Sequence, residues 1–290
     1  MSKHAYMIIA HNQFELLKIL IKMLDDARND IFIHIDAKVN DFDFTEFQNL
    51  THHSKLVFTD RISITWGDFS QVKAEMILLK SAIENESAQA PYSYFHLLSG
   101  VDLPIKTNDE IHNFFSVNNG KEFIHFSKNE LSPEFENRIK YYHFFRKKRN
   151  LFFKILAQII LKFQKLIGIN RLKDNALIVQ KGANWFSITN AFAKYVISKC
   201  DEIDKIFNYS YCCDEVFLQT IFVNSPFKDN LFMPNCDNNH FACARLIDWK
   251  RGNPYVWQKD DYDLIKSSPC MFARKFDMSV DTEIIDMLTK

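Results

Sequence analysis

The sequence predicts an α/β fold, and three observations lead to this expectation. The first 130 residues alternate short apolar runs with segments of helical periodicity, as strands and helices do when they take turns along a chain. Hydrophobic residues make up 47% of the 290 residues and aromatic residues 14%, enough to fill a sizeable core. No internal repeat or low-complexity tract interrupts the chain. We therefore expect a single domain over residues 1–290, with a mixed central sheet flanked by helices.

The first part of the chain, to about residue 130, carries four of the expected strands. The strands are 5–10, 31–35, 55–58 and 94–98, and the helices are 14–24 and 72–83. Three of these strands are followed by His11, by Asp36 and by the segment 99–104. Ligands of open α/β sheets bind at the carboxyl ends of the strands. These residues are therefore the first candidates for a binding site.

The second part, from about residue 180 to 290, has an α+β pattern. Its expected strands are 185–189, 241–249 and 271–276, and its expected helices are 191–199, 215–222 and one that starts near 282. Since no linker-like segment separates the two parts, one domain remains the simplest organisation.

The charge of the chain is balanced in total but uneven along its length. The 36 basic and 36 acidic side chains cancel, which argues against a dedicated nucleic-acid binder. Residues 138–173 nevertheless contain eleven basic residues and no acidic one. The rest of the chain therefore has 25 basic against 36 acidic side chains.

Within this basic segment, residues 151–167 form an apolar helical pattern with lysines at 154, 162 and 165. Such a basic amphipathic insert suits the interface of an anionic membrane, with its apolar face down and its cations against the headgroups. The alternative is an ordinary amphipathic helix packed on the domain. The pattern leaves both open and disfavours a nucleic-acid partner.

The six glycines lie too far apart to form a GxG, which excludes a dinucleotide-binding fingerprint and a P-loop. A phosphorylated ligand would therefore need side-chain cations or a metal. The two Asp-x-Asp strings, at 41–43 and 261–263, lie in polar connections, where a chance match is the better explanation. The histidines show no HExxH spacing and no GxSxG occurs, so we expect neither a metal site nor a nucleophilic hydrolase.

Cysteine usage and the absence of long apolar runs bear on location. The six cysteines lack CxxC spacing, so reduced core thiols are expected. The apolar run near the N-terminus is too short for a signal peptide, and no stretch of 18 uncharged apolar residues occurs. We expect a cytoplasmic protein and leave open a peripheral place on the inner face of the cytoplasmic membrane.

Two charged pairs suggest chemistry. Asp214 and Glu215 come at the start of an expected helix, where free amides can orient carboxylates. Arg274 and Lys275 lie between apolar residues, where two cations can neutralise a diphosphate leaving group in place of Mg²⁺. Each pair alone would more often be an ordinary surface feature.

Seven motifs occur together in a fixed order. They are AYMIIAH (5–11), HID (34–36), WGDFSQVKA (66–74), LLSGVDLPIK (97–106), KGANWFS (181–187), DE (214–215) and FARKFD (272–277). With these motifs the chain, from about residue 5 to 285, resembles the core-2/I-branching family of glycosyltransferases. That family includes β-1,6-N-acetylglucosaminyltransferases and peptide O-xylosyltransferases.

The resemblance implies a GT-A-like domain that takes a UDP-sugar and inverts its anomeric centre without a metal or other cofactor. Residues 1–130 would bind the nucleotide, and residues 180–290 would hold the acceptor and the catalytic group. Glu215 matches the family's general base. The implied donor contacts are Ala10, His11 and Asp36 at the uracil, Asp102 at the ribose or donor sugar, and Arg274 and Lys275 at the diphosphate.

The resemblance also implies acceptor contacts. They are Arg138, Tyr142, Trp185 and Trp249, although either tryptophan could instead be a buried core residue, and Trp66 is expected to support the site from behind. We expect transfer, with GlcNAc favoured, to a glycan or lipid-linked glycan of cell-surface polysaccharide or lipooligosaccharide synthesis. A xylosyl or other UDP-sugar donor is the alternative. Two other classes remain open: a sugar-binding relative without catalysis and a membrane-surface adaptor.

Overall fold

Two sheets organise the part of the chain that this computed structural model describes, residues 3–128, 133–148, 150–173 and 177–289. The larger sheet has the order β3-β2-β1-β4-β7-β6. Its strands are β1 (Lys3–Ala10), β2 (Asn29–Ile35), β3 (Lys55–Phe58), β4 (Tyr92–Ser99), β6 (Phe123–Ile124) and β7 (Phe186–Thr189). Strands β1 to β4 are parallel, whereas β7 pairs antiparallel with both β4 and β6.

The smaller sheet has the order β5-β9-β8 and lies beside the carboxyl ends of the larger sheet's parallel strands. Its strands are β5 (Asp102–Pro104), β8 (Arg245–Ile247) and β9 (Phe272–Arg274). Strand β5 follows β4 almost at once, and β9 pairs antiparallel with it. The expected mixed α/β class is therefore confirmed.

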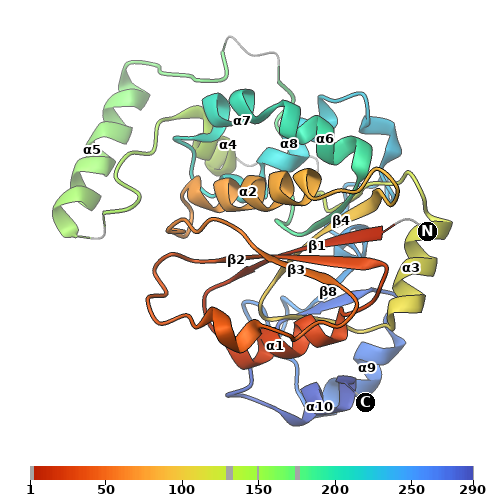
Figure 1. Ribbon diagram of the computed structural model, residues 1–290. Coiled ribbons are helices and arrows are strands. Elements are labelled where there is room, and N and C mark those ends of the chain that lie inside the picture. The colour runs from red at the N-terminus through yellow and green to blue at the C-terminus, as the bar shows by residue number, and fades with distance from the viewer. Residues whose placement is uncertain (1–2, 129–132, 149, 174–176, 290) are drawn as a thin grey trace.

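Helices cover both faces of the large sheet (Figure 1). On one side lie α2 (Ser70–Glu84), α4 (Pro133–Lys140), α6 (Asn190–Ser198), α7 (Cys200–Phe207) and α8 (Phe217–Val223). On the other lie α1 (Phe14–Met23), α9 (Tyr262–Ser267) and α10 (Glu283–Thr289), with α3 (Asn108–Val117) at the edge. Helix α5 (Leu151–Leu166) projects from the body.

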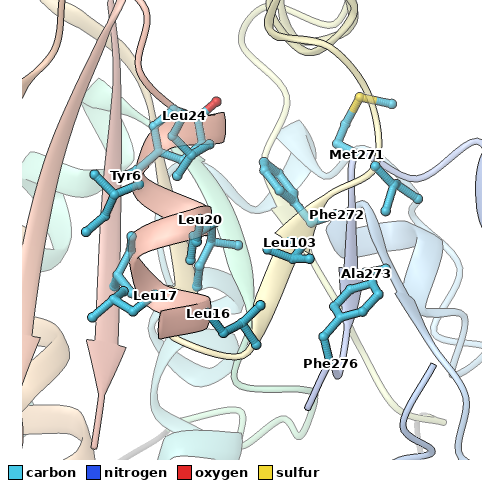
Figure 2. Close-up of a cluster of buried hydrophobic side chains, with 14 of the residues drawn as sticks. Tyr6, Leu16, Leu17, Leu20, Leu24, Leu103, Met271, Phe272, Ala273 and Phe276 are labelled. Atoms are coloured by element: carbon cyan, nitrogen blue, oxygen red, sulfur yellow. The ribbon is translucent and has the colours of Figure 1, made fainter. Parts of the chain in front are cut away.

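One core joins the beginning of the chain to strand β9. Leu16, Leu17 and Leu20 recur at helical spacing on α1 and are fully buried. Phe272 and Phe276 face them from across this core, as Figure 2 shows. This packing holds β9, and the charged residues that follow it, against the nucleotide-binding half predicted from the sequence.

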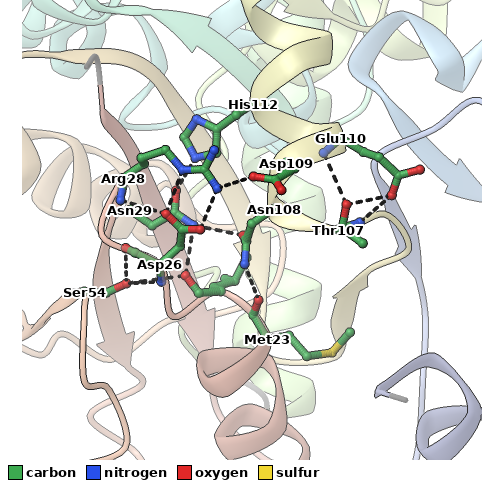
Figure 3. A network of polar contacts seen from close by, with 11 residues as sticks. Met23, Asp26, Arg28, Asn29, Ser54, Thr107, Asn108, Asp109, Glu110 and His112 are labelled. Carbon is green, nitrogen blue, oxygen red and sulfur yellow. Dashed lines mark hydrogen bonds and ion pairs between the residues drawn. The ribbon is translucent and has the colours of Figure 1, made fainter.

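The opposite, amino-terminal edge of the sheet is closed by polar contacts (Figure 3). Arg28 donates to Asp26 at 2.8 and 2.6 Å and to Asp109 of α3 at 2.7 Å. Thr107 and Glu110 form a capping box at the start of α3. Since these polar groups bond one another, this edge stabilises the fold. The candidate ligand site lies at the opposite edge, where the parallel strands end.

The predicted elements agree with the structure to within two residues, with one exception. The strand expected at 241–249 is wrong over its first half, because Asn239 caps a 3₁₀ turn over His240–Cys243 and Ala244 has a left-handed φ of 59°. The helix expected at 215–222 begins later, at Phe217, because Cys213–Glu215 forms a separate 3₁₀ turn. Helices α3, α4, α7 and α9 and the short strands β5 and β6 were not predicted.

The basic segment forms the predicted helix, α5, but its surroundings differ from those of a packed surface helix. Gln164 is its only buried residue, whereas several of its large apolar side chains are exposed. Arg149, one of the eleven cations, lies outside the described residues. In the described part of the chain no helix is long and apolar enough to cross a membrane. All six cysteines are free, as expected.

Candidate active site

The carboxyl ends of β1, β2 and β4 meet closely. Asp36 donates its backbone N–H to the Ala10 carbonyl at 3.0 Å, and Gly100 donates to the Ile9 carbonyl at 2.9 Å. A Cβ on Gly100 would lie 2.9 Å from the Cβ of Ala10, so only glycine fits against this strand end without a shift. The structure thus brings Ala10 and Asp36 together, with His11 exposed beside them.

The Asp36 carboxylate is held by backbone donors. Its Oδ1 accepts from the N–H groups of Lys38 at 3.0 Å and Ile64 at 3.2 Å. Arg61, which the motif reading missed, donates to the carbonyls of Ile35 at 3.1 Å and Asp36 at 2.8 Å. These contacts fix the end of β2 and the orientation of a carboxylate suited to accept from a base N–H.

Asp102 and Arg274 lie opposite each other in the β5–β9 register. Arg274 Nη1 is 2.8 Å from Asp102 Oδ1, and the Asp102 carboxylate also accepts from the Ser99 backbone N–H and hydroxyl, both at 2.8 Å. Asp102 is 2% exposed. Its carboxylate therefore holds Arg274, while the contact with the ribose or donor sugar that the resemblance implied stays a prediction.

Trp257 and Trp185 hold the Arg274–Lys275 segment. Trp257, 1% exposed, donates its indole N–H to the Arg274 carbonyl at 2.9 Å and its backbone N–H to the Lys275 carbonyl at 3.0 Å. The Arg274 guanidinium lies 4.4 Å from the centre of the Trp185 ring. Stacking on Trp185 orients the cation without neutralising it.

Glu215 lies at the end of the 3₁₀ turn, and its side chain is 41% exposed. Arg138 of α4 approaches its carboxylate at 3.5 Å, so this expected acceptor contact lies beside the candidate base. The Glu215 carbonyl accepts from Gly182 N–H at 2.9 Å. A Cβ on Gly182 would lie 1.8 Å from the His125 carbonyl oxygen, so this close approach requires glycine.

The segment from Gly182 to Trp185 joins the two groups of charges. Gly182 bonds the backbone of Glu215, and Trp185 stacks on Arg274. Three residues of extended chain span at most about 10 Å. The candidate base and the candidate leaving-group cation are therefore connected through one short segment of chain.

Two further carboxyl groups lie behind Glu215. Burial and the neighbouring Glu215 raise the pKa of Asp214 to about 7. Burial and the neighbouring Asp214 raise the pKa of Glu75 on α2 well above its usual value. Gln71 donates to Asp214 at 3.1 Å. These acids were not singled out as a pair, because only the fold brings α2 to the 3₁₀ turn.

A profile of the Core-2/I-Branching enzyme family matches residues 4–273. The chain belongs to this family. The family membership and the mixed sheet together bear out the GT-A-like fold class.

Two similar xylosyltransferases are longer than this chain. Xylosyltransferase 2 of Rattus norvegicus is 25% identical over 301 residues, covering 98% of this chain and 33% of the relative. Xylosyltransferase 1 of Homo sapiens is 24% identical over 302 residues, covering 98% and 30%. The chain thus spans about a third of the length of these relatives. Mouse xyloside xylosyltransferase 1 superposes over 94% of this chain and 97% of its own, with 11% identity and a TM-score of 0.40.

Three aromatic residues of this Core-2/I-Branching family member lie at the surface or near it. Trp249 is 50% exposed, so the buried-core alternative is wrong for it. Tyr142 packs against Arg171, with the guanidinium 4.6 Å from its ring, and its backbone bonds Gln164 of α5. Trp66 is 70% exposed against the edge of Tyr211, which contradicts the expected supporting place behind the site.

The Asp-x-Asp strings have structural partners. Asp43 caps a short turn by accepting from Thr45 at 2.8 Å, and Asp261 pairs with Arg251 at 2.7 Å. Among the residues that the structure describes, no cluster of three or more His, Cys, Asp or Glu side chains is arranged to hold a metal ion.

Proposed function

We propose that this protein is an inverting glycosyltransferase that moves a sugar from a UDP-sugar to a hydroxyl group of a glycan. The observation that carries the proposal is the connection of Glu215 to Arg274 through the segment from Gly182 to Trp185. Family membership and the xylosyltransferase names of the relatives add support. Asp36, with Ala10 and His11 beside it, is assigned to the uracil.

The proposed reaction is a single displacement. The acceptor oxygen attacks the anomeric carbon on the face opposite UDP, a glycosidic bond forms, and the bond from that carbon to the diphosphate oxygen breaks. Glu215 takes the acceptor hydroxyl's proton. The electron pair leaves on UDP, where Arg274 and Lys275 stabilise the negative charge. The reaction then needs no divalent ion, and the diphosphate charge is met by protein cations.

Two donor sugars are considered. GlcNAc is the proposed donor sugar, within cell-surface polysaccharide or lipooligosaccharide synthesis on the cytoplasmic side of the membrane. Xylose is the second candidate, because the named relatives are xylosyltransferases. Assays with UDP-GlcNAc and UDP-xylose side by side distinguish them. Binding without turnover of any UDP-sugar would favour a sugar-binding relative instead.

The base assignment is tested with Glu215→Gln, which keeps the shape of the side chain and removes its basicity. We expect turnover to fall by about 100-fold or more while UDP binding, followed by calorimetry, stays unchanged. Glu84→Gln, at an exposed glutamate of α2, is the matched control. Near-normal turnover of Glu215→Gln contradicts the assignment. Treating the wild type with EDTA should leave its rate unchanged, and a strict requirement for Mn²⁺ or Mg²⁺ would overturn the metal-free reaction.

A further inference from the structure

Helix α5 presents an apolar face to the outside. Its outer stripe consists of Phe152, Ile155, Ile159, Phe163 and Leu166, which are 67, 52, 57, 56 and 82% exposed. Successive members are three or four residues apart, so they share one side of the helix. A continuous exposed stripe of large apolar side chains marks an interaction surface more often than isolated exposed residues do.

Anchoring contacts fix α5 to the body near its carboxyl end. Gln164 donates to the Tyr142 carbonyl at 2.9 Å and accepts from the Tyr142 N–H at 2.8 Å. Arg171, just after the helix, donates to the Ile206 carbonyl at 2.7 Å. The rest of the helix projects from the body in Figure 1. The outer stripe is thus held in a defined direction while it remains uncovered.

Cations accompany the outer stripe. Lys154 and Lys162 line a shallow depression together with Ile155 and Ile159 of the stripe. Lys147 and Lys148, exposed on the approach to the helix, extend the positive surface, and no acidic residue occurs from 138 to 173. A second copy docked helix to helix would bring these like charges together, and a nucleic acid would leave the apolar stripe uncovered. An anionic lipid surface complements both features.

The same segment reaches the candidate active site. Arg138, at the end of α4, pairs with Glu215 at 3.5 Å, and its carbonyl accepts from Tyr211 N–H at 2.9 Å. The Arg146 guanidinium lies 3.8 Å from the centre of the Tyr211 ring, against which the exposed Trp66 also packs. A surface that receives α5 would therefore lie on the side of the molecule where the candidate base is exposed.

We propose that α5 lies in the interface of an anionic membrane, with the outer stripe at the acyl boundary and its lysines at the headgroups. Resting on the proposed transfer function, we further assign the acceptor to the class of membrane-anchored glycans. The membrane then delivers the acceptor hydroxyl to Glu215 by diffusion in the plane of the bilayer.

The test uses the whole protein and vesicle flotation. Vesicles of phosphatidylcholine with phosphatidylglycerol should carry the wild type, and vesicles of phosphatidylcholine alone should not. The stripe variant Ile155→Gln/Ile159→Gln/Phe163→Gln should lose binding, and Lys154→Gln/Lys162→Gln should weaken it by about tenfold or more. Lys80→Gln/Lys266→Gln, at exposed lysines elsewhere, is the matched control and should bind as the wild type does.

Unchanged flotation of the stripe variant overturns the docking surface. Light scattering tests whether a second copy of the chain covers the stripe instead. A wild-type dimer that the stripe variant abolishes would contradict the proposal. The acceptor is tested separately. The stripe variant should retain transfer to a water-soluble acceptor and lose transfer to a lipid-anchored one. Equal transfer to both contradicts the acceptor class, whereas vesicle binding without transfer from any UDP-sugar leaves docking intact and refutes the proposed function.

Discussion

The β5–β9 pair and helix α5 differ in how their side chains are satisfied. At the β5–β9 pair, Asp102 is buried and meets Arg274 at 2.8 Å, with Ser99 supplying further donors. On α5, large apolar side chains face outward among lysines. The first region is satisfied within the fold, whereas the second leaves a surface for another partner. The comparison teaches that a buried ion pair can orient a cation within the fold. An exposed apolar helix face, in contrast, indicates where a partner binds.

The largest expected effect is a loss of turnover on changing the β5–β9 pair. Arg274→Met removes the cation proposed to stabilise the leaving diphosphate and leaves Asp102 without its ionic partner, so turnover should fall by about 100-fold or more. Initial rates over a range of UDP-sugar concentrations measure this loss, and urea unfolding separates it from loss of the fold. Lys275→Met, which leaves the Asp102 pair intact, is the comparison. A loss below about tenfold for Arg274→Met would remove Arg274 from the proposed leaving-group site.

A smaller, pH-dependent effect is expected behind Glu215. Because the folded-state pKa of Asp214 is raised to about 7, the native protein holds a proton that the unfolded chain releases near pH 4. The free energy of unfolding from this group therefore falls as pH rises from about 4 to about 7, by at most about 4 kcal/mol. Asp214→Asn removes that loss.

The stability of Asp214→Asn relative to the wild type should therefore increase across this pH window. Urea unfolding of both proteins at several pH values measures the difference, in which the titration of other groups cancels. Gln71, which donates to Asp214, keeps an acceptor in the variant. A difference that stays flat with pH would mean that Asp214 is ionised throughout the window.

The smallest effect on stability is expected on α5. Replacing Ile155, Ile159 and Phe163 by Gln should change the free energy of unfolding by no more than about 0.5 kcal/mol per site, because these side chains are exposed. Phe272→Ala, in the core, should cost about 3–5 kcal/mol. Urea unfolding of both variants gives the contrast. If the α5 variant is destabilised as strongly as the core variant, its stripe packs on the body and the comparison fails.

The sequence located the candidate residues at strand ends well because they come directly after apolar runs. Asp36 and Asp102 come just after β2 and β4, so the strand ends located them, whereas Arg274 was found as one of two adjacent cations between apolar residues. The hydrogen bond from Trp257 to Arg274 and the proximity of Glu75 to Asp214 were not predicted. Both depend on which distant segments the fold brings together.

The two regions also differ in how far their surroundings could be predicted. Helical periodicity located α5 almost to the residue, yet periodicity does not say which side of a helix the body covers. At 241–249 an apolar run resembled a strand although it contains a 3₁₀ turn and the left-handed Ala244. Local backbone geometry of this kind is set by caps such as Asn239, which apolar periodicity alone does not reveal.

The central place of β9 in the order β5-β9-β8 has a consequence for biosynthesis. Asp102 of strand β5 is translated 172 residues before Arg274, the residue of β9 with which it pairs. The parallel strands can pair earlier, but the small sheet cannot close until β9 has been translated. A nascent chain therefore forms the Asp102–Arg274 pair late, after most of the larger sheet has been synthesised.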